Sequence, residues 1–169
     1  MLDKKMEDAL NAQLNAEFYS AYLYLSMAAY LESLNLSGMA NWMRVQFQEE
    51  QFHGTMFFDF ILERGGKVAL EPIAQPQIDW KDDVEVFEVT LAHEQKVTGL
   101  INDLVYLARD KRDNASEIFL QWFVKEQVEE ESTASTILGK LKFAQGSPQA
   151  ILMIDQELGG RVFIPPTIA

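Results

Sequence analysis

The amino-acid sequence predicts an all-α protein: a four-helix bundle with a long crossover between its second and third helices and a short fifth helix near the C-terminus. Two observations predict this fold. The 169 residues include only five prolines, which leaves four long stretches free to form helix. In each stretch apolar residues recur at alternating intervals of three and four, which places them on one helix face. A chain of this length fits one domain with a sizeable core, so we expect a single domain over residues 1–169.

The first two helices are predicted to form a hairpin. One helix covers residues 4–33, and a short turn at 34–37 follows it. Ser37 is the expected N-cap of the second helix, over residues 38–64, because a serine hydroxyl can accept a hydrogen bond from the first turn. A glycine pair at 65–66 ends this helix, since glycine is common just beyond a helix C-terminus.

The third and fourth helices are predicted to form a second hairpin, from 82 to 110 or 111 and from Asn114, as N-cap, to 144. Residues 67–80 contain two prolines and show no helical period, so they form the connection between the hairpins. A helix of about 28 residues is roughly 42 Å long. An extended link of about 14 residues can span that length at about 3.3 Å per residue. The hairpins are therefore joined by a crossover along a bundle of about residues 4–144.

An acidic residue interrupts the apolar face of every long predicted helix, close to its midpoint. Because helices that cross at mid-length bring their midpoints to one level, we expect these acids to converge. His53 lies one turn after one of the acids, and Gln127 lies one turn before another, on the same helix faces. The four acids are Glu17, Glu50, Glu94 and Glu130.

Four carboxylates buried together are unfavourable, because desolvation and mutual repulsion raise their pKa values and destabilise the fold. Bound cations resolve this conflict, and carboxylates with one imidazole suit iron, manganese or zinc. A single mid-helix glutamate is usually solvated, and Glu50-x-x-His53 alone is a weak motif. Four interruptions at one level favour a metal site over a structural bundle whose acids face solvent.

Three segments, AEFYSAYLYLSMAAY, NWMRVQFQEEQFHG and FVKEQVEEE, resemble prokaryotic non-haem ferritins, and the likeness covers essentially the whole chain. Ferritin-like di-iron proteins take one glutamate from each of two helices and Glu-x-x-His from each of the other two. Here the fourth helix has Gln127-x-x-Glu130 instead, which is similar to ferritins and differs from bacterioferritins. Bacterioferritins carry a haem-ligating methionine where this chain has Gln51. The resemblance therefore implies a single ferritin-like domain without haem.

The resemblance also implies a ferroxidase centre that binds two iron ions and oxidises Fe(II) to Fe(III) with O2 or peroxide. By this resemblance Glu17, Glu50 and His53 bind the first iron. Glu50 bridges to the second iron, which Glu94 and Glu130 bind. The implied function is iron storage and detoxification, with the product kept as ferric oxo-hydroxide mineral inside an oligomeric shell.

Further residues near this centre match the family. The resemblance places Gln127 near the bound oxygen species. Tyr24 lies two turns from Glu17 on the same face, where it donates a hydrogen bond or an electron, or serves only as a core tyrosine. A third, neighbouring iron is implied at a second group of acids, for which a solvated acidic face is the alternative. That group is Glu49, Glu126, Glu129 and Glu130.

Composition narrows the possible functions. With 14 basic and 26 acidic residues the net charge is −12, so nucleic acid is not an expected partner and cations are. The absence of cysteine excludes disulfides, thiolate zinc sites and the cysteine-ligated module of rubrerythrins. No apolar run approaches the roughly 20 residues that span a bilayer, and the charged N-terminus does not look like a signal peptide. A cytoplasmic protein without membrane contact is expected. Di-iron oxygenases and manganese catalases use similar bundles but usually have longer chains.

A short fifth helix is predicted at about 148–158, because Ser147 suits an N-cap and Pro148 the first turn. The tail at 161–169 is expected to be extended. This helix carries an apolar set that the four-helix core does not need: Ile151, Leu152, Met153, Ile154 and Leu158. Such residues need a partner surface. The resemblance implies that copies of this helix meet at symmetry axes of a homo-oligomeric shell of about 24 subunits; alternatively, the helix caps its own bundle.

Overall fold

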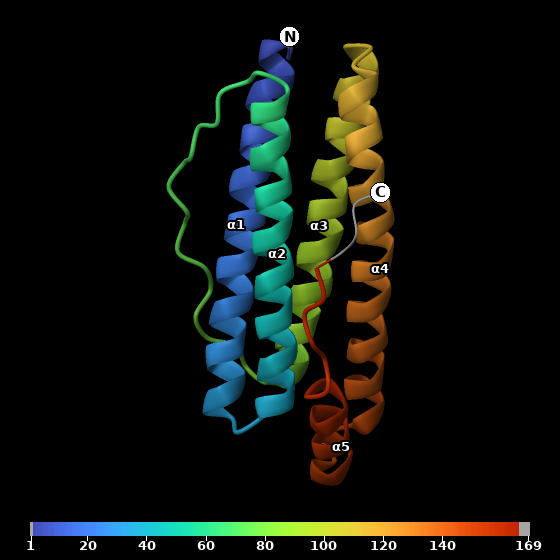
Figure 1. Ribbon diagram of the computed structural model, residues 1–169. Helices are drawn as coiled ribbons and strands as arrows, with labels where there is room; N and C mark the ends of the chain where they lie inside the picture. The colour runs from blue at the N-terminus through green and yellow to red at the C-terminus, as the bar shows by residue number, and fades with distance from the viewer. Residues whose placement is uncertain (1, 166–169) are drawn as a thin grey trace.

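The computed structural model describes residues 2–165, and within that range it contains five α-helices and no strand. Four long helices form the bundle, and the fifth lies at one end of it (Figure 1). The predicted all-α four-helix bundle with a short C-terminal helix is confirmed. The helices are α1 (Lys4–Ser33), α2 (Ser37–Glu63), α3 (Asp83–Asp110), α4 (Asn114–Ala144) and α5 (Pro148–Leu158).

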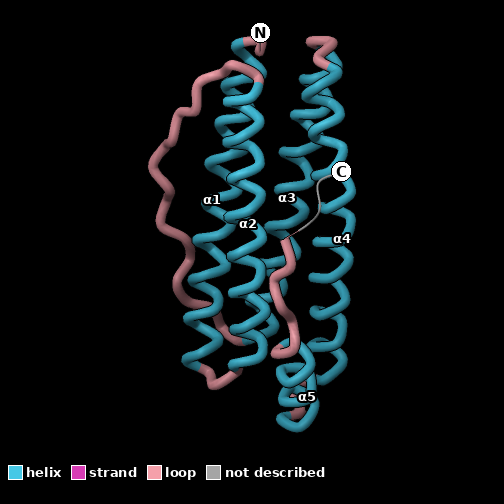
Figure 2. The backbone as a smooth tube through the Cα atoms, viewed as in Figure 1, coloured by secondary structure: helices cyan, strands magenta, loops and turns pink. Residues whose placement is uncertain are grey.

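Two hairpins, α1 with α2 and α3 with α4, are joined by a connection that travels the length of the bundle beside α1 (Figure 2). Side chains of α1 hold this connection at both ends. Asn11 donates to the Lys67 carbonyl at 3.0 Å and accepts from the Ala69 N–H at 2.7 Å. Ser26 donates to the Gln77 carbonyl at 2.7 Å. The long link is therefore a fixed crossover.

Aspartates cap three of the long helices. Asp3, Asp82 and Asp113 each accept a hydrogen bond from a backbone N–H in the first turn of α1, α3 and α4. The predicted N-caps Ser37 and Asn114 are wrong, since each is the first residue of its helix. Asp113 replaces Asn114 as the cap because its carboxylate accepts both the N–H and the hydroxyl of the serine three residues later.

The fifth helix packs against the beginning of α2. Gly38 permits this close approach, because a Cβ at that position would lie 1.7 Å from the backbone oxygen of Asp155. The Asp155 carboxylate accepts a hydrogen bond from the Met39 N–H at 2.8 Å. A residue of α5 thus caps the first turn of α2, the role that was expected of Ser37.

The two faces of α5 have different environments. Ile154 and Leu158 are buried against the end of the bundle, whereas Leu152 and Met153 are 60% and 73% exposed. One face therefore caps the bundle, as the alternative expected, and the other remains available to a partner. Beyond α5 the chain has no regular secondary structure over residues 161–165, and the rest of the predicted tail lies outside the described residues.

Apolar side chains fill the bundle as two separate clusters. One surrounds Met27, Met39 and Leu141, and the other surrounds Leu10 and Phe57. Between the clusters the same helix faces carry buried polar side chains, so the core is divided near mid-length. The polar residues of the division are Gln13, Glu17, Gln46, Glu50, His53, Glu94, Gln127 and Glu130.

No helix within residues 2–165 is long and apolar enough to cross a membrane.

Candidate metal centre

One glutamate from each long helix is buried in the polar division of the core. Glu17 on α1, Glu50 on α2, Glu94 on α3 and Glu130 on α4 have exposed fractions of 1%, 2%, 1% and 5%. Ionised glutamates almost never reach such burial without a charge partner. The fold therefore places four acids where only protonation or a bound cation can make them tolerable.

Glu17, Glu50 and His53 form the tightest part of this cluster. Each offers one ligand atom, and these atoms lie within 4.8 Å of one another. Within residues 2–165 no other group of three histidine, aspartate or glutamate side chains brings its ligand atoms within this distance. Glu50 Oε2 lies 3.5 Å from His53 Nδ1, is fully buried and accepts no hydrogen bond from any described residue. A buried carboxylate oxygen without a donor is a vacant ligand position, which fits a metal ion.

Glu94 of α3 belongs to the other part of the cluster, where uncharged side chains donate hydrogen bonds to it. The Tyr24 hydroxyl donates to Glu94 Oε1, and the Gln127 amide donates to Glu94 Oε2 at 3.1 Å and to its backbone carbonyl at 3.2 Å. Tyr24 is fully buried, and burial followed by the charge of Glu94 raises the pKa of its phenol well above the usual value. The phenol therefore stays protonated and remains a donor.

Two further amides, which sequence reasoning missed, hold the remaining acids. Gln13 donates to Glu17 Oε1 at 2.8 Å, and Gln46 donates to Glu130 Oε2 at 2.8 Å. Their exposed fractions are 3% and 0%. The signal was present, because each glutamine lies four residues before an interrupting glutamate of its own helix and so shares its face.

Burial dominates the electrostatics of the cluster. It raises the pKa values of Glu17 and Glu50 well above the ordinary range, and neighbouring carboxylates add to the shift. Burial, then Glu94 and then Glu49 raise the pKa of Glu130 to about 8. A metal-free cluster therefore holds protons at neutral pH, and metal binding must release them.

Aromatic rings support the imidazole. Trp122 and Phe123 of α4 contact His53 edge-on, with ring centroids 5.3 Å and 5.8 Å away. The other histidine, His93, lies 2.8 Å from the Ser20 hydroxyl, outside the close ligand group. Burial and the nearby Lys96 lower the pKa of His93 to about 4, so it is neutral. The packing of Trp122 and Phe123 thus fixes the orientation of the His53 ring beside Glu50, whereas His93 contacts Ser20.

The second predicted acid group is more open. Glu49 and Glu126 are half-buried and Glu129 is exposed. They do not approach one another as closely as the inner triad does. Instead Glu49 pairs with Arg161 of the tail, Oε2 to Nη2, at 2.7 Å. The sequence did not indicate this partner.

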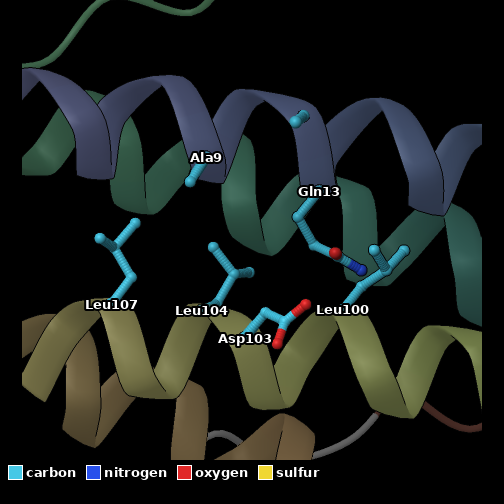
Figure 3. A pocket seen from close by; sticks show the side chains of 7 residues that line it. Ala9, Gln13, Leu100, Asp103, Leu104 and Leu107 are labelled. Carbon is cyan, nitrogen blue, oxygen red and sulfur yellow. The ribbon is translucent and has the colours of Figure 1, made fainter.

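Two surface grooves end at the amides that hold the acids. A groove of about 240 Å³ between α1 and α3 is lined by Gln13 and Leu104, and Figure 3 shows Gln13 directed from α1 toward α3. Another groove, of about 320 Å³ between α3 and α4, is lined by Thr98, Gln127 and Glu131. Each groove is therefore bordered by one amide side chain that donates a hydrogen bond to an acid of the cluster.

The ligand set indicates the chemistry. Anionic oxygen ligands stabilise Fe(III) more than Fe(II), because the harder and more highly charged ion gains more from them. They therefore favour the loss of an electron from a bound Fe(II). Because carboxylates can change their mode of binding, the oxidised ion can also leave.

Comparisons with known proteins show which family the chain resembles. A family model described as a ferritin-like domain matches residues 7–144. Bacterial non-heme ferritin of Bacteroides fragilis is 42% identical over 161 residues, covering 95% of this chain and 100% of the relative. The bacterial non-heme ferritin of Staphylococcus aureus is 37% identical over 163 residues, covering 96% and 98%.

Solved structures match equally well. An engineered closed form of the Archaeoglobus fulgidus ferritin is 48% identical, with a TM-score of 0.96 over 97% of this chain and 100% of that chain. The open-pore ferritin of the same archaeon is also 48% identical, with a TM-score of 0.95 over 96% and 100%.

Proposed function

The chain belongs to the ferritin family, which supports iron storage, and we propose that it oxidises Fe(II) at the buried cluster and stores the product as ferric oxo-hydroxide mineral. The observation that carries this proposal is the unpartnered Glu50 Oε2 between Glu17 and His53. Glu17, Glu94 and Glu130 each accept at least one hydrogen bond, whereas Glu50 accepts none among the described residues, which makes Glu50 Oε2 the oxygen best suited to take a cation.

Each residue has a role in this proposal. Glu17 and His53 bind the first Fe(II), and Glu50 bridges to a second held by Glu94 and Glu130. Two Fe(II) ions side by side can each give one electron to a single oxygen molecule, or to peroxide. Gln127 and Tyr24 orient Glu94 through the hydrogen bonds described above, and Gln127 lies on the groove between α3 and α4, where oxygen can arrive.

A third iron position is part of the proposal. Glu49, Glu126 and Glu129, together with Glu130, would hold an ion that has left the centre or waits to enter it. Replacing the first three by alanine should leave two irons per subunit and change the iron-to-oxygen stoichiometry. Equal iron occupancy in crystals of both proteins would favour a merely solvated acidic face.

Haem is not expected, and Gln51 is exposed at the position where bacterioferritins carry their haem-ligating methionine. Protein purified from haem-supplemented cells should show no Soret band. A stoichiometric haem at a subunit interface would contradict the prediction.

We also propose that copies of the chain assemble into a shell of about 24 subunits, in the cytoplasm. Structures similar to this one are ferritins described by their open pore or closed form. The exposed face of α5 adjoins Phe143, which is 89% exposed, and a groove of about 300 Å³ separates α4 from α5 there. Such an apolar patch needs cover. Truncation before Ser147 should yield small oligomers that still bind iron.

One experiment tests storage as a whole. The protein is incubated with Fe(II) in air and separated by size, and iron is measured in each fraction. About 24 copies of a 19.3 kDa chain make a particle of several hundred kilodaltons, and iron should elute with it. A chain that remains a monomer or dimer at micromolar concentration with iron present would refute storage, even if the metal centre is real.

A further inference from the structure

Arg161 returns from the tail to the acidic face of the bundle. Its Nη2 lies 2.7 Å from Glu49 Oε2, and its Nη1 donates to Gln46 Oε1. The guanidinium carbon lies 4.6 Å above the Trp42 ring. An exposed ion pair contributes little, but the Arg161 and Glu49 side chains are only 25% and 20% exposed. Three groups of α2 therefore fix one cation in place.

The backbone around Arg161 is fixed as well. Asn41 of α2 donates to the Arg161 carbonyl at 3.0 Å. Just before it, Gly159 packs beside Gly38, where an added Cβ on Gly159 would lie 3.3 Å from the Gly38 Cα. The close glycine contact between α5 and α2 thus aims the tail along α2, and the position of Arg161 follows from the fold.

Gln46 connects Arg161 to the buried cluster. Its side chain is fully buried. Because its oxygen accepts from Arg161, its amide nitrogen must be the atom that faces Glu130, to which it donates at 2.8 Å. One amide thus ties a cation at the surface to a carboxylate in the core.

We propose that Arg161 is a resident cation of the third metal position: it balances the charge of Glu49 until a metal ion displaces it, and it sets the affinity of that position. This inference rests on the proposed function. Guanidinium and metal ion cannot both hold Glu49 Oε2 in the same geometry. Arginine does not lose its proton at physiological pH, so the competition persists. The third ion therefore binds more weakly than the first two and binds last.

The acids around Arg161 support this role. Burial raises the pKa values of Glu49 and Glu126, and in both cases the Arg161 charge opposes the rise. Glu126 and Glu129 also repel Glu49. Without a cation these acids, two of them half-buried, would repel one another across α2 and α4. The guanidinium supplies the balancing positive charge in the metal-free protein, and a bound metal ion would supply it in the loaded protein.

The test is a calorimetric titration of the metal-free, full-length oligomer with Zn²⁺. Arg161→Ala should strengthen binding of the third ion about tenfold or more, because the ion no longer has to displace a charged hydrogen-bond donor from Glu49 Oε2. Arg161→Lys, which keeps the charge, should stay close to wild type. The control is Arg44→Ala, since Arg44 pairs with Glu32 at 2.8 Å on an exposed surface and its loss changes the net charge equally. It should leave all three affinities unchanged.

A double-mutant cycle of Arg161 and Glu49 distinguishes competition between the guanidinium and the metal ion from an effect of the substitution on folding. In a Glu49→Gln background, Arg161→Ala should no longer change the third affinity, since the contested oxygen has lost its charge. If Arg161→Ala does not assemble, Arg161→Gln removes the charge while keeping a donor for Gln46. A change in the third affinity that persists in the Glu49→Gln background would overturn direct competition.

The same titration distinguishes this inference from the proposed function. If Arg161→Ala binds two ions tightly and the affinity of the third ion equals that of the wild type, only the role of Arg161 is overturned. A wild-type protein that binds no ion tightly would overturn the metal centre and, with it, this inference.

Discussion

The two halves of the buried cluster differ in how their carboxylate oxygens are occupied. On one side, Glu50 Oε2 has no donor and faces Glu17 and His53 at ligand distance. On the other side, both oxygens of Glu94 accept hydrogen bonds, from Tyr24 and a glutamine amide. In the proposed centre the first half can take an ion directly, whereas the second must give up or share its donors when an ion arrives. Ion binding should therefore be unequal, with the first site the tighter.

In the proposed centre Glu50 joins the two halves, so its loss should have the largest effect. Glu50→Ala removes the bridging oxygens, and the initial rate of Fe(II) oxidation should fall at least about a hundredfold, since loss of one charged ligand costs several kcal/mol. Stopped-flow absorbance measures the rate, and circular dichroism should show intact helices. The exposed glutamate at the end of α2, Glu63, provides the control as Glu63→Ala. An unchanged rate in Glu50→Ala would contradict its assignment.

The protons of the metal-free cluster provide a second comparison. The pKa of Glu130 is raised from 4.5 to about 8 in the folded chain. Between these values the folded state holds a proton that the unfolded state has released, so stability must fall as pH rises. The loss is up to about 1.4 kcal/mol per pH unit for one such group.

Thermal unfolding in the presence of a chelator at pH 5, 6.5 and 8 measures this effect. Glu130→Gln should flatten the dependence, because the substituted amide does not titrate, while Glu63→Gln should not. Metal-free protein that grows more stable between pH 5 and pH 8 would show that the buried acids are ionised when folded.

Tyr24→Phe should have the smallest effect and sharpens the difference between the halves. It frees Glu94 Oε1 from its donor, so the second ion should bind about fivefold more tightly, since one hydrogen bond from a neutral donor contributes roughly 1 kcal/mol. Binding of the first ion should not change. Anaerobic Fe(II) titration separates the two. If binding is unaltered but repeated oxidation slows, Tyr24 acts as an electron donor instead.

Most of the helical architecture was predictable because helix periodicity is local. The predicted helix at 38–64 and the observed Ser37–Glu63 differ by one residue at each end. The convergence of the interrupting glutamates followed from the same spacing, as did the burial of Gln127 and His53. The N-caps Ser37 and Asn114 failed because capping depends on which acceptor reaches the free N–H groups. At α2 that acceptor is Asp155, which lies 116 residues beyond the Met39 N–H it caps.

The fifth helix shows the limit of pattern reasoning. Its sequence predicted an apolar helix that needs a partner, but not which face would meet the bundle. The contact through Gly38 turns Ile154 and Leu158 inward and leaves Leu152 and Met153 exposed. A one-dimensional pattern records amphipathicity, whereas the choice of face depends on where two backbones can approach.

By itself the sequence determined the helices, the hairpins and the level at which four acids interrupt the core, because residues three and four apart share a helix face whatever surrounds them. The tertiary structure alone decided the partners of each acid. Tyr24 meets Glu94 across 70 positions of the chain, and Arg161 meets Glu49 across 112. Such contacts depend on how separate elements pack, so only the folded chain shows that Glu50 Oε2 is buried without a donor while Glu17, Glu94 and Glu130 each accept a hydrogen bond.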